Sequence, residues 1–173
     1  MAVRNAVDEA ENKTVLVTGS TDGVGRLVAR RLADQGARVL IHGRDRIRGE
    51  QLLNQIRAAG RGSAVFLPAD FSSLAEVRRL PDVVRKVCDR LDILVNNAGI
   101  SSGGSAGIRE TSQDGHELRF AVNYLSGAHQ AAAAAHDARK AGPHRERLFA
   151  RPTSDRLRRC YADPRLQRLA RLC

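Results

Sequence analysis

With 173 residues, 42% of them hydrophobic, the chain is long enough to form one domain with a buried core. Its net charge of +10 is uneven: residues 137–173 hold eleven Lys or Arg and four Asp or Glu, whereas residues 1–136 hold eighteen and fifteen. The basic excess belongs to the end of the chain, where Phe149 and Tyr161 are the only aromatic residues. Nucleic-acid binding is therefore disfavoured, because single-strand binding relies on several stacking rings.

Cysteine content and the N-terminal residues bear on the cellular compartment. The three cysteines, Cys88, Cys160 and Cys173, are scattered and form no CxxC pair, which argues against a disulfide framework or a zinc site. The N-terminal residues are charged and lack the apolar stretch of a secretory signal, and no segment is apolar over the length of a membrane span. We therefore expect a cytoplasmic protein without a metal site or a membrane partner.

The segment from Lys13 to Gln35 carries the clearest pattern in the chain. After a polar arm at 1–12, residues 14–18 are β-branched or aliphatic and predict a buried strand, and apolar residues at helical spacing in 26–35 predict a helix. Three glycines lie between them, in a loop that can approach a phosphate closely at a helix N-terminus. A tight turn without a ligand is the alternative. The predicted pyrophosphate-binding residues are Gly19, Ser20, Thr21, Asp22, Gly23, Val24 and Gly25.

Strands and helices alternate along the next part of the chain. Pro81 is expected to kink its helix or to begin the second half of that helix. The alternation is typical of a doubly wound α/β fold of the Rossmann type, with a parallel sheet between two helical layers. Right-handed crossovers would place the first strand centrally, with the second and third on one side and the fourth on the other. We predict strands at 37–42, 63–68 and 91–95, and helices at 47–59, from Ser72 or Ser73 to Cys88, and at 111–125.

Beyond residue 127 the composition changes. Five alanines at 131–135 favour helix but offer little volume for a core, and 143–173 holds nine arginines and no convincing strand. We expect an incomplete sheet of about four strands, with the C-terminal strands missing and the fourth strand at an exposed edge. We divide the chain into an arm at 1–12, a dinucleotide-binding domain at 13–127 and an Ala- and Arg-rich tail at 128–173.

Two further landmarks follow the predicted strands: an Asp-Phe pair after the third and the sequence NNAG after the fourth. Together with the TGxxxGxG loop, this pattern over 13–127 resembles the short-chain dehydrogenase/reductase family. The resemblance implies a Rossmann-type sheet that binds NAD(H) or NADP(H), with Asp70 near the adenine ring and residues 97–99 along the adenosine ribose. Asp70 taken alone would be interpreted as a turn residue. The cofactor-binding residues predicted here are Asp70, Phe71, Asn97, Ala98 and Gly99.

Arg44 bears on the choice of cofactor. An acidic residue about twenty positions after the glycines would bind the ribose 2′-hydroxyl of NAD, whereas an arginine there suits the 2′-phosphate of NADP. Arg44 lies nineteen positions after Gly25, and its planar guanidinium matches a phosphate. Asp45 is better explained as the cap of the next helix. We predict NADP(H) as the preferred cofactor and NAD(H) as the second candidate; a solvated surface charge is the alternative for Arg44.

The catalytic residues that the resemblance implies are incomplete. Asn123, in the sequence FAVNYLSG, matches the family's helix asparagine, which supports a water path to the catalytic lysine; a helix-surface asparagine is the alternative. The family also uses a serine and a Tyr-x-x-x-Lys pair, in which the tyrosine is the general acid or base. Tyr124 and Tyr161 both lack a lysine four positions later, and Ser154 has no apolar strand before it.

We therefore interpret the chain as an NAD(P)-dependent oxidoreductase by lineage, which transfers hydride between NADP(H) and a small-molecule carbonyl or alcohol. We expect little or no activity from the chain as it stands. A non-catalytic dinucleotide-binding module is the second hypothesis, and nucleic-acid binding through the arginine-rich tail is the third and weakest. The abrupt change in composition also raises the hypothesis that a shift of reading frame produced residues 128–173. Neither the substrate nor the oligomeric state is predicted by the sequence.

Overall fold

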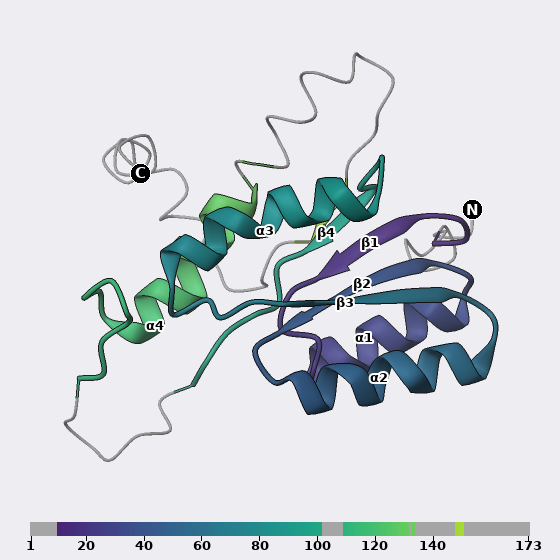
Figure 1. Cartoon of the computed structure of the whole chain (residues 1–173), viewed down its shortest axis with the longest axis horizontal. Coiled ribbons are helices and arrows are strands. Elements are labelled where there is room, and N and C mark those ends of the chain that lie inside the picture. The colour runs from purple at the N-terminus through teal and green to yellow at the C-terminus, as the bar shows by residue number, and fades with distance from the viewer. Residues whose placement is uncertain (1–9, 102–108, 132, 134–147, 151–173) are drawn as a thin grey trace, which may run out of the picture.

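The computed structural model describes residues 10–101, 109–131, 133 and 148–150. Residues 148–150 are described by their backbone alone. Strands and helices alternate along most of this length (Figure 1). In chain order the elements are β1 (Thr14–Val17), α1 (Gly23–Asp34), β2 (Arg38–Gly43), α2 (Arg46–Ala59), β3 (Ser63–Pro68), α3 (Leu74–Val87), β4 (Ile93–Val95), α4 (Leu118–Phe120), the π-helix η1 (Ala121–Leu125) and β5 (Leu148–Ala150).

The strands form one parallel sheet in the order β3-β2-β1-β4-β5. Val15 of β1 lies between Val39 of β2 and Ile93 of β4, so β1 is the central strand, as predicted. α1 and α2 cover one face of the sheet and α3 covers the other (Figure 1). The chain has the predicted doubly wound, Rossmann-type α/β fold. The strand order reverses at β1, and folds of this class bind ligands beyond the carboxyl ends of the strands at that point.

Two apolar clusters stabilise the sheet from opposite faces. Val15 and Val17 pack with residues of α1 and α2, whereas Leu16 between them packs with residues of α3. Successive side chains of a strand point to opposite faces, so a strand that is covered on both faces must be apolar throughout. This requirement explains the continuous apolar run from Val15 to Val17 in β1.

α3 is one continuous helix from Leu74 to Val87, so Pro81 does not begin a separate second half. Because proline has no N–H, it cannot donate to the carbonyl of Val77, four residues earlier. The buried side chain of Gln130 supplies the missing donor: its Nε2 lies 2.8 Å from that carbonyl oxygen. The backbone carbonyl that proline leaves free is thus satisfied from a neighbouring helix.

The helix predicted at 111–125 begins only at Leu118, and the prediction is wrong for 111–117. Thr111 forms an antiparallel bridge with Glu117, and Gly115 has a φ of +79°. The Ser112 hydroxyl oxygen accepts hydrogen bonds from two backbone N–H groups of this segment, at 3.2 and 3.3 Å. Such local bonds from a serine side chain compete with the helix ladder, and this competition outweighs the apolar spacing.

A strand that the sequence did not predict lies beyond residue 143. Leu148–Ala150 forms β5 and pairs in parallel with β4, Leu148 opposite Ile93. β4 therefore has a neighbour on both sides and is not the exposed edge that we expected. An apolar triplet between arginines is too short to give a periodic pattern. The helix that starts at Leu118 also continues past residue 127, to Ala131.

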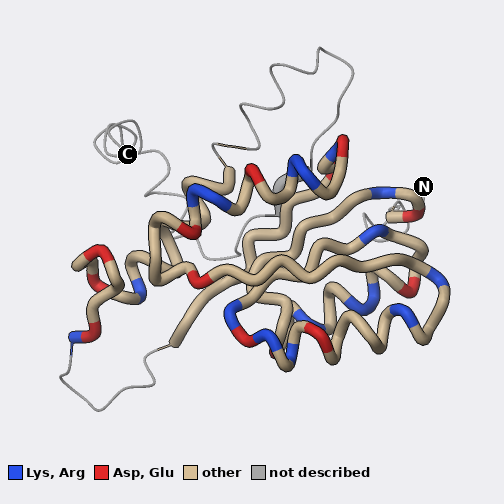
Figure 2. The backbone as a smooth tube through the Cα atoms, in the orientation of Figure 1, with Lys and Arg blue, Asp and Glu red and all other residues tan. Residues whose placement is uncertain are grey.

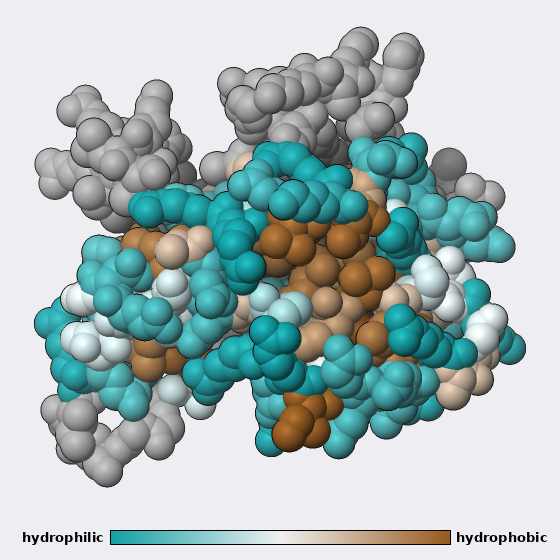
Figure 3. Space-filling model, viewed as in Figure 1, coloured by the Kyte–Doolittle hydropathy of each residue, from teal (hydrophilic) through white to brown (hydrophobic). Residues whose placement is uncertain are grey.

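Charged residues of both signs are interspersed along the described helices and loops (Figure 2). Figure 3 shows an apolar surface between α3 and α2, over the edge strand β3, where Val65 and Phe66 are half-buried. None of the described helices has both the length and the apolar character that crossing a bilayer requires. The described surface is thus mixed in charge, with its apolar area along one edge of the sheet.

Candidate functional site

The glycine loop (residues 18–25) joins β1 to α1 at the carboxyl end of the central strand. Gly19 and Gly23 have φ values of +64° and +54°, in the left-handed region that favours glycine. A Cβ atom at Gly19 would lie 2.7 Å from the Cα atom of Ala98, whereas one at Gly23 would meet no atom within 4 Å. Gly19 therefore allows close packing against the segment after β4, and Gly23 borders open space.

Thr18 and Asn97 hold the glycine loop against the segment after β4. The Thr18 Oγ1 accepts hydrogen bonds from the N–H groups of Asn97 and Ala98, both at 3.0 Å. The Asn97 Nδ2 donates to the carbonyls of Thr18 and Gly19, at 3.0 and 3.1 Å. A Cβ atom at Gly25 would lie 2.3 Å from this Nδ2. The structure thus brings four predicted site residues together around Thr18, which the sequence did not single out.

The first turn of α1 supplies backbone N–H groups that have no acceptor within the helix. The Asp22 carboxylate accepts from the N–H of Gly23 at 2.8 Å, and the Arg26 N–H donates to the Asp22 carbonyl at 3.1 Å. The N–H groups of Val24 and Gly25 lie between these two and at the positive end of the helix dipole. Val24 is 70% exposed. This helix end, beside the open space at Gly23, suits an anionic ligand such as a pyrophosphate.

Ser20 and Thr21 shape the loop from its inner side. Ser20 is fully buried, and its N–H donates to the carbonyl of His42 at 2.8 Å. Thr21 packs against Gly43, where a Cβ atom would lie 2.5 Å from Cγ2 of Thr21, and its carbonyl accepts from Arg26 at 3.3 Å. These two buried residues therefore position the loop backbone, and their part in cofactor binding stays a prediction.

His42, near the carboxyl end of β2, is a site residue that the sequence did not predict. Its ring is buried, its Nδ1 accepts a hydrogen bond from the N–H of Gly19 at 3.1 Å, and it stacks on Phe71 with ring centroids 4.2 Å apart. Burial lowers the pKa of His42 from 6.5 to about 4, against smaller raising effects of the Ala69 backbone and the Asp70 carboxylate. The ring is therefore neutral near pH 7. A histidine within the apolar run RVLIHG was the available signal.

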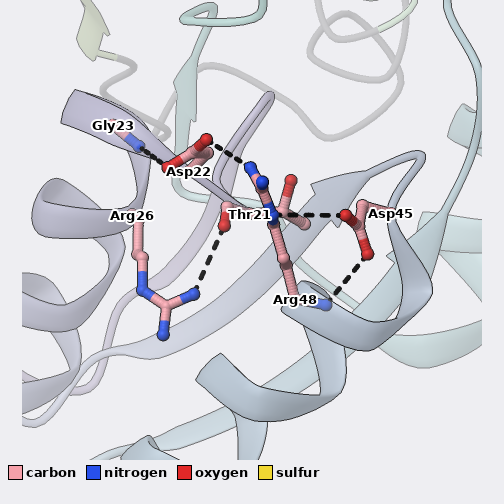
Figure 4. A network of polar contacts seen from close by, with 6 residues as sticks. All are labelled: Thr21, Asp22, Gly23, Arg26, Asp45 and Arg48. Atoms are coloured by element: carbon pink, nitrogen blue, oxygen red, sulfur yellow. Dashed lines mark hydrogen bonds and ion pairs between the residues drawn. The ribbon is translucent and has the colours of Figure 1, made fainter.

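Arg48 links the first turns of α1 and α2 (Figure 4). Its guanidinium forms ion pairs with Asp22, the N-cap of α1, and with Asp45, the N-cap of α2. The Asp45 carboxylate also accepts from the Arg48 N–H at 3.0 Å, which confirms its predicted role as a cap. Arg44, directly after β2, is exposed and pairs with no carboxylate among the residues that the structure describes. Arg48 thus neutralises both N-cap aspartates and leaves Arg44 available.

Asp70 and Phe71 follow β3 but differ in accessibility. The Asp70 carboxylate is half-buried and accepts from the N–H of Ser72 at 2.9 Å, while its own N–H donates to Glu76 at 2.6 Å. Phe71 is 5% exposed and belongs to the apolar cluster under α3. Asp70 therefore organises the turn and is still partly accessible, whereas Phe71 could meet a ligand only through its backbone.

Asn123 lies in η1, and π-helical turns are frequent at functional sites. Its side-chain amide pairs with the backbone of Ile100: Nδ2 donates to the carbonyl at 3.0 Å and Oδ1 accepts from the N–H at 2.8 Å. A Cβ atom at Gly99 would lie 3.5 Å from this Oδ1. The structure thus brings Asn123 to the segment after β4, and its supporting role in catalysis stays a prediction.

The tyrosines and the possible metal ligands also bear on the chemistry of the site. The ring of Tyr124 stacks on Phe120, with centroids 5.3 Å apart. Tyr161 and Ser154 lie outside the described residues. Within the described ranges, no three His, Cys, Asp or Glu residues are grouped so that they could hold a metal ion.

A family model, that of the short chain dehydrogenases, matches residues 13–143. The chain belongs to this family. The match begins where the predicted dinucleotide-binding domain begins and ends beyond residue 127, so it includes part of the predicted tail. The division at 127 remains a prediction.

Several known proteins are similar to this part of the chain. A protein of Streptomyces sp. (strain C5) named as a daunorubicin C-13 ketoreductase, DnrU, is 42% identical over 116 residues, which are 66% of this chain and 39% of that protein. The RhlG/NADP active-site complex of Pseudomonas aeruginosa is 33% identical with a TM-score of 0.63, over 78% of this chain and 51% of that one. The NADH-dependent reductase A1-R′ complexed with NAD is 28% identical with a TM-score of 0.65, over 83% and 61%. The chain therefore spans less than two thirds of each relative.

Proposed function

We propose that this chain forms the dinucleotide-binding part of a short chain dehydrogenase and binds NADP(H) in preference to NAD(H). The observation that carries the proposal is the N-terminus of α1, where the N–H groups of Val24 and Gly25 border the open space at Gly23. These N–H groups would donate to the pyrophosphate. When bound, the nicotinamide would supply hydride transfer to or from the carbon of a carbonyl or alcohol.

The preference for NADP(H) rests on the distribution of charge beyond β2. A 2′-phosphate would be repelled by unpaired carboxylates at Asp22 and Asp45, but Arg48 forms ion pairs with both. The exposed guanidinium of Arg44 is then available for a bidentate contact with the phosphate. The NADP complex of RhlG supports this choice, and the NAD complex of reductase A1-R′ keeps NAD(H) as the second candidate.

Calorimetric titration of NADP⁺ and NAD⁺ tests the proposal in the wild type and in Arg44→Ala. We expect Arg44→Ala to weaken NADP⁺ binding about tenfold or more and to leave NAD⁺ binding unchanged, because it removes a charge-assisted contact with the phosphate. Arg57→Ala, an exposed arginine in the last turn of α2, is the matched control and should change neither affinity. Equal effects of Arg44→Ala and Arg57→Ala would contradict the assignment of Arg44.

For the reaction, we propose a small-molecule carbonyl or alcohol as substrate, with Asn123 in a supporting role, and little or no turnover by the chain of 173 residues. The support is that neither Tyr124 nor Tyr161 has a lysine four positions later. Oxidation of NADPH with a panel of ketones and aldehydes measures this turnover, and turnover that is lost in Tyr161→Phe would contradict the proposal.

For the location of the protein, we propose the cytoplasm. The scattered cysteines support this proposal, because their spacing argues against a disulfide framework.

Binding without turnover would also fit a non-catalytic dinucleotide-binding module. The coding DNA distinguishes the enzyme lineage from the non-catalytic module, because a shift of the reading frame after residue 127 would indicate descent from an enzyme. A frame that encodes an apolar strand ending in serine, followed by Tyr-x-x-x-Lys, would support the lineage and the division at 127. If neither alternative frame encodes these features, the module is the better description.

A further inference from the structure

His42 joins the end of β2 to the glycine loop through its backbone and its ring. Its carbonyl accepts from the N–H of Ser20 at 2.8 Å, and its own N–H donates to the Ser20 Oγ at 3.0 Å. Its ring Nδ1 accepts from the N–H of Gly19 at 3.1 Å. The two backbone contacts can form with any residue at position 42. The contact with Gly19 depends on this side chain.

The ring is fixed from its other side and is incompletely satisfied. It stacks on Phe71 with an interplanar angle of 28° and is 2% exposed. Since Nδ1 accepts a hydrogen bond, the proton of the neutral ring lies on Nε2. Among the described residues Nε2 has no hydrogen bond of ordinary geometry, although the Ala69 backbone acts on the ring and raises its pKa. The contact of Nδ1 with Gly19 is therefore the hydrogen bond of ordinary geometry that the ring makes within this part of the chain, and a leucine would lose it.

We infer that His42 is a positioning residue for the glycine loop, which it holds through Gly19 in the shape that receives a dinucleotide; the inference rests on the proposed cofactor binding. The Gly19 carbonyl is bound by Asn97 Nδ2 at 3.1 Å, so both peptide groups that flank the left-handed Gly19 are fixed. The N–H groups at the start of α1 follow directly in the chain. A loop that is ordered beforehand costs the ligand less entropy on binding.

Protonation of the ring would reverse the contact with the loop. An Nδ1–H would face the N–H of Gly19, and two donors cannot share a hydrogen bond. The charged group that acts on the ring is the Asp70 carboxylate. Gly19 and Phe71, which contact the ring, and Ser20, which contacts the His42 backbone, carry no charge. Dinucleotide affinity should therefore fall in acid as His42 becomes protonated.

Two substitutions in the full chain separate the contact from the bulk of the side chain. His42→Leu fills the space but removes the acceptor, whereas His42→Asn keeps an acceptor, because its Oδ1 can take the place of Nδ1. By titration with NADP⁺ at pH 7.5, we expect the Kd to rise about tenfold in His42→Leu and to stay within about threefold in His42→Asn. Val84→Ala, in the cluster under α3, is the control for lost stability and should leave the Kd unchanged.

The pH profile supplies a readout that a purely structural role would not move. The Kd of the wild type should rise as pH is lowered toward 4, and this rise should exceed the rise in His42→Asn, which keeps every other charged group of the protein and of the ligand. Parallel profiles, or a His42→Leu protein that binds like the wild type, would overturn the inference and leave the proposed function standing. A wild type that binds neither NADP⁺ nor NAD⁺ would overturn both.

Discussion

Replacing Gly25 by alanine should separate the glycine loop from the segment after β4. The added Cβ atom would lie 2.3 Å from Nδ2 of Asn97 and 2.4 Å from the carbonyl oxygen of Gly19. If the Asn97 amide moved away, it would lose its hydrogen bonds to the carbonyls of Thr18 and Gly19. The Gly19 backbone cannot give way by itself, because its N–H is bound to the ring of His42.

The size of the effect follows from these two contacts. Overpacking costs about 1–3 kcal/mol, and each lost hydrogen bond of Asn97 adds about 1 kcal/mol. We therefore expect Gly25→Ala to lower the free energy of unfolding by about 3–5 kcal/mol and to weaken NADP⁺ binding by more than about tenfold. Urea denaturation followed by circular dichroism measures the first quantity, and calorimetric titration measures the second.

Gly60→Ala is the control for this experiment. Gly60 caps the far end of α2 with a φ of +72°, and a Cβ atom there would meet nothing within 4 Å. The substitution should cost only the left-handed strain of about 1–2 kcal/mol and leave the affinity for NADP⁺ unchanged. A Gly25→Ala protein that is as stable as Gly60→Ala and binds NADP⁺ like the wild type would refute the reasoning.

Three further predictions concern residues around the site and under α3. Burial lowers the pKa of His42 from 6.5 to about 4, so between these pH values the unfolded chain binds more protons than the folded chain. The free energy of unfolding should therefore be highest above pH 6.5 and fall by about 3 kcal/mol at most as the pH is lowered toward 4. Denaturation curves measured across this pH range should show a smaller fall in His42→Asn. Gln130→Leu should lower the free energy of unfolding by about 1–3 kcal/mol because it leaves the Val77 carbonyl unpaired. The same substitution should cost less in a Pro81→Ala background, where the N–H of the alanine can donate to that carbonyl. A double-mutant cycle in which Gln130→Leu costs the same in both backgrounds would contradict this. Arg48→Gln should cost less than about 1 kcal/mol of stability, since its ion pairs are exposed, yet weaken NADP⁺ more than NAD⁺ in calorimetry.

The sheet and the glycine loop could be predicted because local sequence determines them. β1 is apolar from Val15 to Val17 because both of its faces are covered there, and such a run can be recognised from the sequence alone. Asp45 was recognisable as a cap because the rule for N-caps involves residues only three positions apart. The positions of these strands and caps can therefore be predicted from short segments of the sequence.

The remaining features depend on contacts between distant segments. Thr18 binds residues that are 79 and 80 positions later, and His42 binds Gly19 from 23 positions away. No spacing rule connects such pairs, so a role could be predicted for the glycines of the loop but not for these two polar residues. β5 was missed for a related reason, since three residues gain their strand geometry from β4 and not from their own pattern.

The residues that we propose to bind the cofactor are positioned by contacts within one part of the chain. The glycine loop is held by Thr18, by His42 from β2 and by Asn97 after β4, and its helix end is capped by Asp22. These residues all precede residue 100. Among the described residues, the Asn123 side chain hydrogen-bonds to the backbone of Ile100, beside Gly99. We therefore predict that substitutions in the glycine loop change NADP⁺ affinity, whereas Asn123→Ala leaves that affinity near the value of the wild type.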